Sequence, residues 1–191
     1  MRPTQFLFPA LSFLSLATAS VIPSLTAEPR IVARQNNCMT SDIAIQIASR
    51  YISIFATHDN DTISELIADN FAMVSDSVNY IAGIPLGNPT YRSKAAFQQA
   101  EASKPFERAS LVNVDAVSCN GVVVLRWLSV IGTQQLEVKG ITTLYTVNGG
   151  DEGVIGPGGW QVSQAFSEFN SAAWLVDLGQ SCAAPSAKSS S

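Results

Sequence analysis

The chain has 191 residues, of which 47% are hydrophobic and 14% are charged, and its formal net charge is −4. That length and apolar share suffice for one domain with a sizeable core. The acidic balance is a poor match for nucleic acid or an anionic membrane, and no apolar run is long enough to cross a bilayer. We therefore expect neither nucleic acid nor a membrane among its partners.

The N-terminus has the features of an export signal. Arg2 precedes an apolar run over residues 6–17, and Ala17-Thr18-Ala19 fits the small-x-small rule for signal-peptide cleavage. We predict a signal peptide over 1–19, a linker or pro-segment over 20–37, a domain over 38–182 and a disordered tail over 183–191. The protein is therefore expected to be secreted, in the secretory pathway or outside the cell.

Other features suit an exported chain. Asn60-Asp61-Thr62 is an N-glycosylation acceptor, so we predict a glycan on Asn60. The three cysteines allow one disulfide. We favour Cys38–Cys119, because both residues flank elements whose ends need fixing, but Cys38–Cys182 would tie the two ends of the domain and remains the alternative. With a single His and scattered thiols, no metal site is predicted.

Three helices are predicted in the first half of the domain. Thr40 can cap the first helix, and a capping box of Thr62 and Glu65 starts a second, short one. Residues 93–103 form the third. The apolar residues that recur every three or four positions in the first helix are Ile43, Ile47, Tyr51, Ile54 and Phe55.

Strands dominate the second half. A short strand is predicted over Phe71 to Val74, and four long ones over 109–118, 122–131, 136–147 and 160–169. Asn-Gly and Gly-Thr turns join the first three long strands tightly, which implies antiparallel hairpins. Gly140, inside a strand, predicts a bulge. Helices followed by antiparallel strands indicate an α+β domain, with helices covering one face of a curved sheet.

The last strand carries the strongest hint of a pocket. Side chains alternate along a strand, which places five residues on one face: Trp160, Val162, Gln164, Phe166 and Glu168. This apolar face thus includes an amide and a carboxyl, which are costly in a core unless they are paired or line a polar cavity. We therefore predict that this strand forms the floor of a pocket.

Several strings resemble a secreted fungal branch of the nuclear transport factor 2-like (SnoaL-like) family. They cover residues 74–79, 125–127, 138–141 and 167–179, and the resemblance spans 38–179. It implies a cone-like curved antiparallel sheet packed on three N-terminal helices, chemistry that needs no cofactor, and a convex sheet face that forms homodimers. The branch includes enzymes that catalyse dehydration and intermolecular hetero-Diels–Alder addition of a tropolone-derived quinone methide to a terpene alkene.

Within that frame, candidate catalytic groups are Glu168, Asp76 and Arg126. Glu168 would protonate a leaving hydroxyl; the alternative is a structural ion pair with Arg126. Asp76 would lie at the pocket rim; its alternative role is to cap a turn. The predicted substrate-binding residues are Tyr51, Phe55, Trp127, Gln164, Asn170 and Trp174.

Two functions therefore stay open. The first is a cofactor-free lyase or cyclase that holds small apolar organic substrates in contact, where proximity replaces strong chemistry. The second is a non-catalytic secreted protein that binds a small apolar ligand. A conservative change of Glu168 would lower turnover in the first case and leave ligand affinity nearly unchanged in the second.

Overall fold

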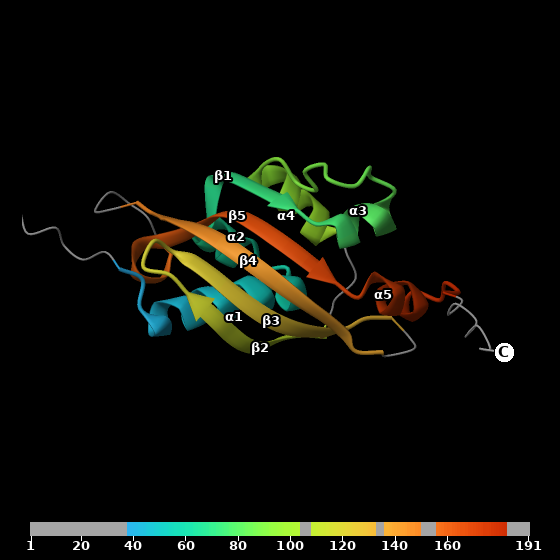
Figure 1. Cartoon of the computed structure of the whole chain (residues 1–191). Helices are drawn as coiled ribbons and strands as arrows, with labels where there is room; N and C mark the ends of the chain where they lie inside the picture. Colours follow the sequence, from blue (N-terminus) through green and yellow to red (C-terminus); the bar gives the residue numbers. More distant parts are fainter. Residues whose placement is uncertain (1–37, 104–107, 133–135, 150–155, 183–191) are drawn as a thin grey trace, which may run out of the picture. The chain divides into compact units, whose positions relative to one another are not determined.

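Five strands form a single curved sheet in the order β1-β5-β4-β3-β2 (Figure 1). The computed structural model describes residues 38–103, 108–132, 136–149 and 156–182, so the predicted signal peptide, linker and tail lie outside it. The elements are α1 (Ser41–Thr57), α2 (Asn60–Leu66), β1 (Ile67–Val74), α3 (Asp76–Ala82), α4 (Lys94–Ala102), β2 (Arg108–Val117), β3 (Val122–Val130), β4 (Val138–Asn148), the 3-10 turn η1 (Pro157–Gly159), β5 (Trp160–Phe169) and α5 (Ser171–Asp177).

The long helix α1 covers one face of the sheet and packs chiefly against β2 (Figure 1). Thr40 caps it as predicted, with its hydroxyl accepting from the Ile43 amide at 3.3 Å. The helix ends at His58, whose φ of 52° lies in the left-handed region. Its buried stripe follows from the predicted periodicity and consists of Ala44, Ile47, Ala48, Tyr51, Ile52 and Ile54.

The predicted capping box at the second helix is wrong. Asp59 caps α2 instead, with its carboxylate accepting from the amides of Asp61 at 3.0 Å and Thr62 at 3.2 Å. The Thr62 hydroxyl donates to the same carboxylate at 2.6 Å, so it supports the cap rather than forming it. These bonds lower the pKa of Asp59, the Thr62 hydroxyl contributing most.

The predicted fold class is confirmed, with more elements than expected. The three antiparallel pairs β2–β3, β3–β4 and β4–β5 connect the four long strands. β1 starts earlier than predicted, at Ile67, and adds a fifth strand that runs parallel to β5. Two helices lie where none was assigned: α3 follows β1, and α5 follows β5. Both contribute to the functional site.

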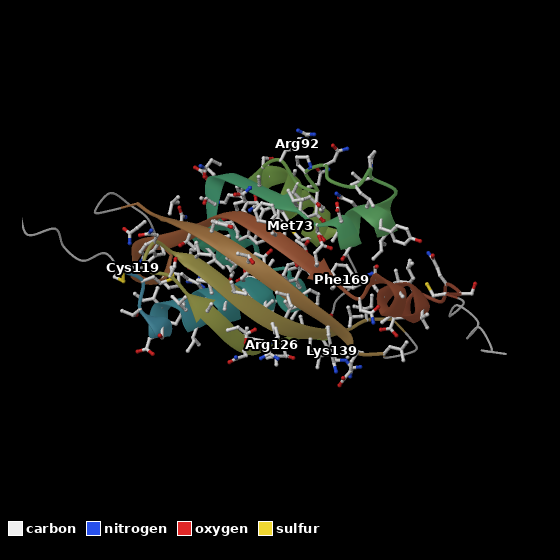
Figure 2. The ribbon with its side chains drawn as sticks, in the orientation of Figure 1. Met73, Arg92, Cys119, Arg126, Lys139 and Phe169 are labelled. Carbon is white, nitrogen blue, oxygen red and sulfur yellow. A yellow bond between two sulfur atoms is a disulfide. The ribbon has the colours of Figure 1, made fainter. Side chains whose placement is uncertain are left out.

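The predicted Cys38–Cys119 disulfide is confirmed, and Cys182 is an exposed free thiol. The bond joins the residues before α1 to the turn between β2 and β3, where the Met39 amide also donates to the Cys119 carbonyl at 3.2 Å. Figure 2 shows Cys119 at one end of the strands, with Lys139 and Phe169 toward the other. The bond therefore anchors α1 at the end of the sheet away from the site.

A register shift in β5 overturns the predicted alternation. Thr146 on β4 pairs with Val162, but the preceding Tyr145 pairs with Gln164, so Ser163 is an extra residue in the ladder. After Ser163, the residues of β5 that point inward are those expected to point outward, so Ala165, Ser167 and Phe169 face the core side. Phe166 and Glu168 are exposed and face outward. The predicted shared face therefore ends at Val162.

The predicted bulge at Gly140 is also wrong. Gly140 stands in regular register between Trp127 on β3 and Phe169 on β5. Its lack of a side chain serves instead to make room for the Trp127 ring, because a Cβ there would lie 2.2 Å from that ring.

Candidate functional site

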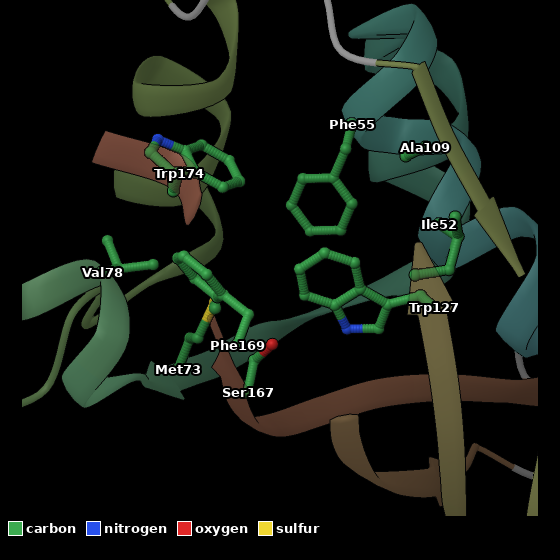
Figure 3. A pocket seen from close by; sticks show the side chains of 9 residues that line it. All are labelled: Ile52, Phe55, Met73, Val78, Ala109, Trp127, Ser167, Phe169 and Trp174. Atoms are coloured by element: carbon green, nitrogen blue, oxygen red, sulfur yellow. The ribbon is translucent and has the colours of Figure 1, made fainter. Parts of the chain in front are cut away.

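A small cavity of about 40 Å³ lies between the inner face of the sheet and the helices α1, α3 and α5. Its walls come from seven elements, among them segments far apart in the sequence, and Figure 3 shows them converging. The lining residues are Ile52, Phe55, Met73, Val78, Ala109, Trp127, Ser167, Phe169 and Trp174. They include four aromatic rings and one hydroxyl, and none has a titratable side chain.

Three of the predicted substrate-binding residues line this cavity. They are Phe55 from α1, Trp127 from β3 and Trp174 from α5. Phe169 connects the two tryptophans, with ring centroids 5.7 Å from Trp127 and 4.9 Å from Trp174. The planes are tilted by 55° and 39°. This wall of offset rings offers π-faces and edges to a flat or alkene-bearing ligand.

One polar chain reaches the cavity wall. The Trp127 indole Nε1 donates to Thr142 Oγ1 at 2.9 Å, and Thr142 Oγ1 lies 2.7 Å from Ser167 Oγ. Thr142 is fully buried and Ser167 is 5% exposed. The sequence prediction missed both residues, because the assumed alternation of β5 turned Ser167 away from the core. The sequence does carry one signal for them, because each is a hydroxyl residue within an otherwise largely apolar strand.

Glu168 lies outside the cavity. Its carboxylate accepts from the backbone amides of Asp76 at 2.7 Å and Ser77 at 2.9 Å, and from the Ser77 hydroxyl. The amides belong to the first turn of α3, so the carboxylate caps that helix from the end of β5, in addition to the Ser75 hydroxyl, which accepts from the Val78 amide. The predicted ion pair with Arg126 is wrong, since Glu168 reaches toward α3 and not toward β3.

Arg126 lies on the outer face of β3 and is bound to Asp115 on β2. Its Nε and Nη2 donate to the two carboxylate oxygens at 2.7 and 2.9 Å. These two hydrogen bonds from Arg126 also lower the pKa of Asp115, and Asn113 contributes a further hydrogen bond. In turn, the carboxylate raises the pKa of Arg126. The guanidinium therefore faces away from the aromatic cavity.

The remaining predicted site residues also fall outside the lining. The Asp76 carboxylate accepts from the Gly87 amide at 2.6 Å and closes the loop after α3. Gln164 pairs across the sheet with Tyr145, while Asn170 caps α5 by accepting from the Ala173 amide at 3.2 Å. Asn60 is exposed at the start of α2, where the predicted glycan remains a prediction.

Tyr51 is core rather than cavity wall. It is 1% exposed, and its hydroxyl contacts the Met73 sulfur at 3.9 Å. Burial raises the pKa of Tyr51, and the nearby Glu101 carboxylate raises it further. The phenol therefore stays neutral and supports Phe55, whose ring lies 5.4 Å from it edge-on.

A second hollow lies on the outer face of the sheet. It is an open groove of about 700 Å³ lined by residues of β2 to β5 and by Glu137 just before β4, and its charged members also include Arg126, Lys139 and Glu168. Its apolar members include Val112 and Ile141, which are 55% and 54% exposed. We call this surface the outer groove.

The described ranges contain neither a metal-binding cluster nor a membrane-spanning helix. No group of three His, Cys, Asp or Glu residues there could hold a metal ion. In the same part of the chain, no helix is both long enough and apolar enough to cross a membrane.

Comparison with known proteins supplies the family. A model of the NTF2-like domain matches residues 37–181. The chain belongs to this family. The family predicted from the sequence is therefore confirmed, and none of the curated proteins compared with this NTF2-like chain matches it.

Solved structures agree with the family at the level of the fold. A loop truncation variant of IdmH aligns with a TM-score of 0.53 and 17% identity, over 71% of this NTF2-like chain and 99% of that one. Wild-type IdmH, a candidate polyketide cyclase from Streptomyces antibioticus, gives 0.50 and 18%, over 72% and 98%. A candidate ketosteroid isomerase from Kribbella flavida DSM 17836 gives 0.50 and 9%, over 78% and 86%. At these identities the likeness concerns the fold alone.

Proposed function

We propose that this NTF2-like protein is a secreted, cofactor-free pocket enzyme that acts on small apolar organic molecules of secondary metabolism. The reaction we propose is the one implied by the sequence resemblance. It is dehydration and/or intermolecular hetero-Diels–Alder addition of a tropolone-type quinone methide to a terpene alkene. The observation that carries the proposal is the cavity walled by Phe55, Trp127, Phe169 and Trp174, with the Ser167 hydroxyl among them.

The lining favours the addition over the dehydration. A hetero-Diels–Alder addition converts three π bonds into one π bond and two σ bonds, one C–C and one C–O, and releases nothing. It needs no proton transfer, so holding the reactants in contact suffices, and effective molarities of about 10⁵ M or more are attainable. Loss of a hydroxyl as water needs an acid. Glu168, Asp76 and Arg126 all lie outside the cavity lining.

The cavity must enlarge to hold a reactant. Its volume of about 40 Å³ accommodates a few water molecules, whereas apolar cavities known to bind benzene measure about 150 Å³. The wall best placed to move is the one formed by Val78 and Trp174. It belongs to two seven-residue helices, α3 and α5, rather than to the sheet. We therefore propose that substrate entry displaces these side chains outward.

Turnover by purified protein tests the proposal. The protein is incubated with a hydroxymethyl tropolone and a humulene-type alkene, and also with a pre-generated quinone methide and the same alkene, while adducts are followed by mass spectrometry. We expect acceleration above the uncatalysed background with the quinone methide. Phe169→Ala should remove most of it, and Phe166→Ala, on the outer face of the same strand, should retain it. Background rates with both substrate pairs would refute the catalytic proposal.

The second candidate is a non-catalytic secreted protein that binds a small apolar ligand. The lack of any titratable side chain among the lining residues favours it, because such a wall binds by contact rather than by proton transfer. Ligand affinity without product formation, lost in Phe169→Ala and kept in Phe166→Ala, would support this function over catalysis.

The outer face of the sheet is proposed as a homodimer contact. It exposes the large apolar side chains Ile141, Tyr145 and Phe166 on neighbouring strands, and the outer groove adds Val112. Burying these residues against a second copy would remove them from water. Light scattering should give a dimer mass for the wild type and a monomer mass for Ile141→Glu. A monomeric wild type would refute the contact.

A further inference from the structure

The hydroxyl chain behind the aromatic wall has a fixed direction of hydrogen donation. The Trp127 indole Nε1 is a donor only, so it occupies one of the two lone pairs of Thr142 Oγ1. The other contact of Thr142 Oγ1 is Ser167 Oγ at 2.7 Å. Two assignments of the hydroxyl hydrogens are compatible with these distances, and they differ in which group is left without an acceptor.

In the first assignment, Ser167 donates to Thr142. Both lone pairs of Thr142 are then used, and its own hydrogen needs another acceptor. Thr142 is fully buried, and the described residues provide it with no third hydrogen-bonding partner. A buried donor left without an acceptor loses the full free energy of its hydration. This assignment is therefore unfavourable.

In the second assignment, Thr142 donates to Ser167. Every polar atom behind the wall is then satisfied, and the remaining hydrogen belongs to Ser167, which lines the cavity and is 5% exposed. Figure 3 shows the Ser167 oxygen beside Phe169 and Trp127, facing the space between the rings. The cavity therefore presents a single directed O–H donor within an otherwise apolar wall.

We propose that Ser167 is a specificity-determining binding residue, which donates a hydrogen bond to a neutral carbonyl or ether oxygen of the ligand. The ligand class that fits is a small conjugated ring with one such oxygen and no charged group. The proposal rests on the proposed function of the cavity and deepens it. In a hetero-Diels–Alder addition, a donor aimed at the carbonyl oxygen of the quinone methide stabilises the negative charge that develops there.

A matched pair of probes separates the contribution of the Ser167 hydrogen bond to ligand affinity from that of apolar contact with the cavity wall. Tropone carries a ring carbonyl, and cycloheptatriene has nearly the same ring without the oxygen. Their affinities are measured by NMR titration of the wild-type chain, Ser167→Ala and Ser163→Ala, together with the carbonyl stretch of bound tropone. Ser163 is the control, because it lies on the same strand and its hydroxyl donates to the Tyr145 carbonyl at 3.1 Å, outside the cavity lining.

The expected result is selective. In Ser167→Ala, the affinity for tropone should fall about five- to tenfold, and the lowered carbonyl frequency of bound tropone should return toward its value in an apolar solvent. Cycloheptatriene should bind all three chains equally, which also shows that Ser167→Ala is folded. Equal tropone affinity in the wild type and Ser167→Ala would refute the proposal that Ser167 donates to the ligand, without refuting the proposal that the cavity binds it. Failure of both probes to bind the wild type would refute both the proposed role of Ser167 and the proposal that the cavity binds a ligand.

Discussion

Gly140 on β4 and Trp127 on β3 are cross-strand partners, and the missing side chain of the glycine is the space that the indole occupies. A Cβ at Gly140 would lie 2.2 Å from one ring carbon of Trp127 and 2.3 Å from another. The ring is thereby held where its Nε1 donates to Thr142 and its face borders the cavity.

Gly140→Ala should therefore displace the Trp127 ring. We expect a loss of about 1–3 kcal/mol in the free energy of unfolding, typical of overpacking a core position, and a change in tryptophan fluorescence. Urea denaturation followed by fluorescence measures both. The control is the double variant Gly140→Ala with Trp127→Phe, whose smaller ring should make the two changes less than additive. Strict additivity would show that the two residues do not interact.

Glu168 should act as a helix cap and not as an acid. Because its carboxylate accepts two backbone amides of α3, Glu168→Ala should lower the free energy of unfolding by about 1–2 kcal/mol. Glu137→Ala, which removes an exposed pair with Lys139, should change it by less than about 0.5 kcal/mol.

Turnover distinguishes the two roles of Glu168. Glu168→Gln keeps an oxygen that can accept from α3, so we expect it to react with a pre-generated quinone methide at nearly the wild-type rate. A folded Glu168→Gln variant with a rate more than tenfold lower would contradict the capping role and support the acid predicted from the sequence.

Asp115 gives the outer face a defined dependence on pH. Arg126 lowers the pKa of this carboxyl below its ordinary value, so the pair stabilises the fold above that value and the contribution is lost as pH falls through the lowered pKa. Asp115→Asn should thus be less stable than the wild type at pH 7, and the difference should shrink below about pH 4. Urea midpoints at both pH values check this. A difference that stays constant with pH would refute the ion pair.

The Cys38–Cys119 bond should stabilise the domain by constraining the unfolded chain. It links residues 81 positions apart, and replacing both cysteines by alanine should cost about 2–4 kcal/mol. Cys182→Ser removes the exposed thiol and should leave the denaturation curve unchanged. Peptide mapping that finds Cys38 joined to Cys182 would contradict the pairing.

Much of the fold could be predicted from local patterns. The apolar period of α1 and the long strand runs lie within single segments, which is why β5 was predicted with its observed bounds, Trp160–Phe169. The helix α3 was missed although it has local caps, since the Ser75 hydroxyl accepts from the Val78 amide and Gly83 ends the helix in the left-handed region; part of its stabilisation, however, is not local. Its first amides are bound by Glu168, more than 90 residues away, and no short window of sequence contains that contact.

The site was harder to predict than the fold, because it depends on one residue of register. Ser163 is extra in the β4–β5 ladder, and beyond it the inward and outward sides of β5 are exchanged. Strict alternation therefore directed Glu168 inward and Ser167 outward, the reverse of the structure. Phe55, Trp127 and Trp174 lie in the cavity wall because their segments carry no such shift, and the substrate binding predicted for them stays a prediction.

The location of a bound ligand shows which of the two hollows is the functional site. Intermolecular NOEs between bound tropone and the methyl groups of the chain distinguish the aromatic cavity from the outer groove. We predict NOEs to Ile52, Val78 and Ala109, which line the cavity. NOEs to Val112 and Ile141 of the outer groove, without any to the first three, would contradict the assignment of the inner cavity as the functional site.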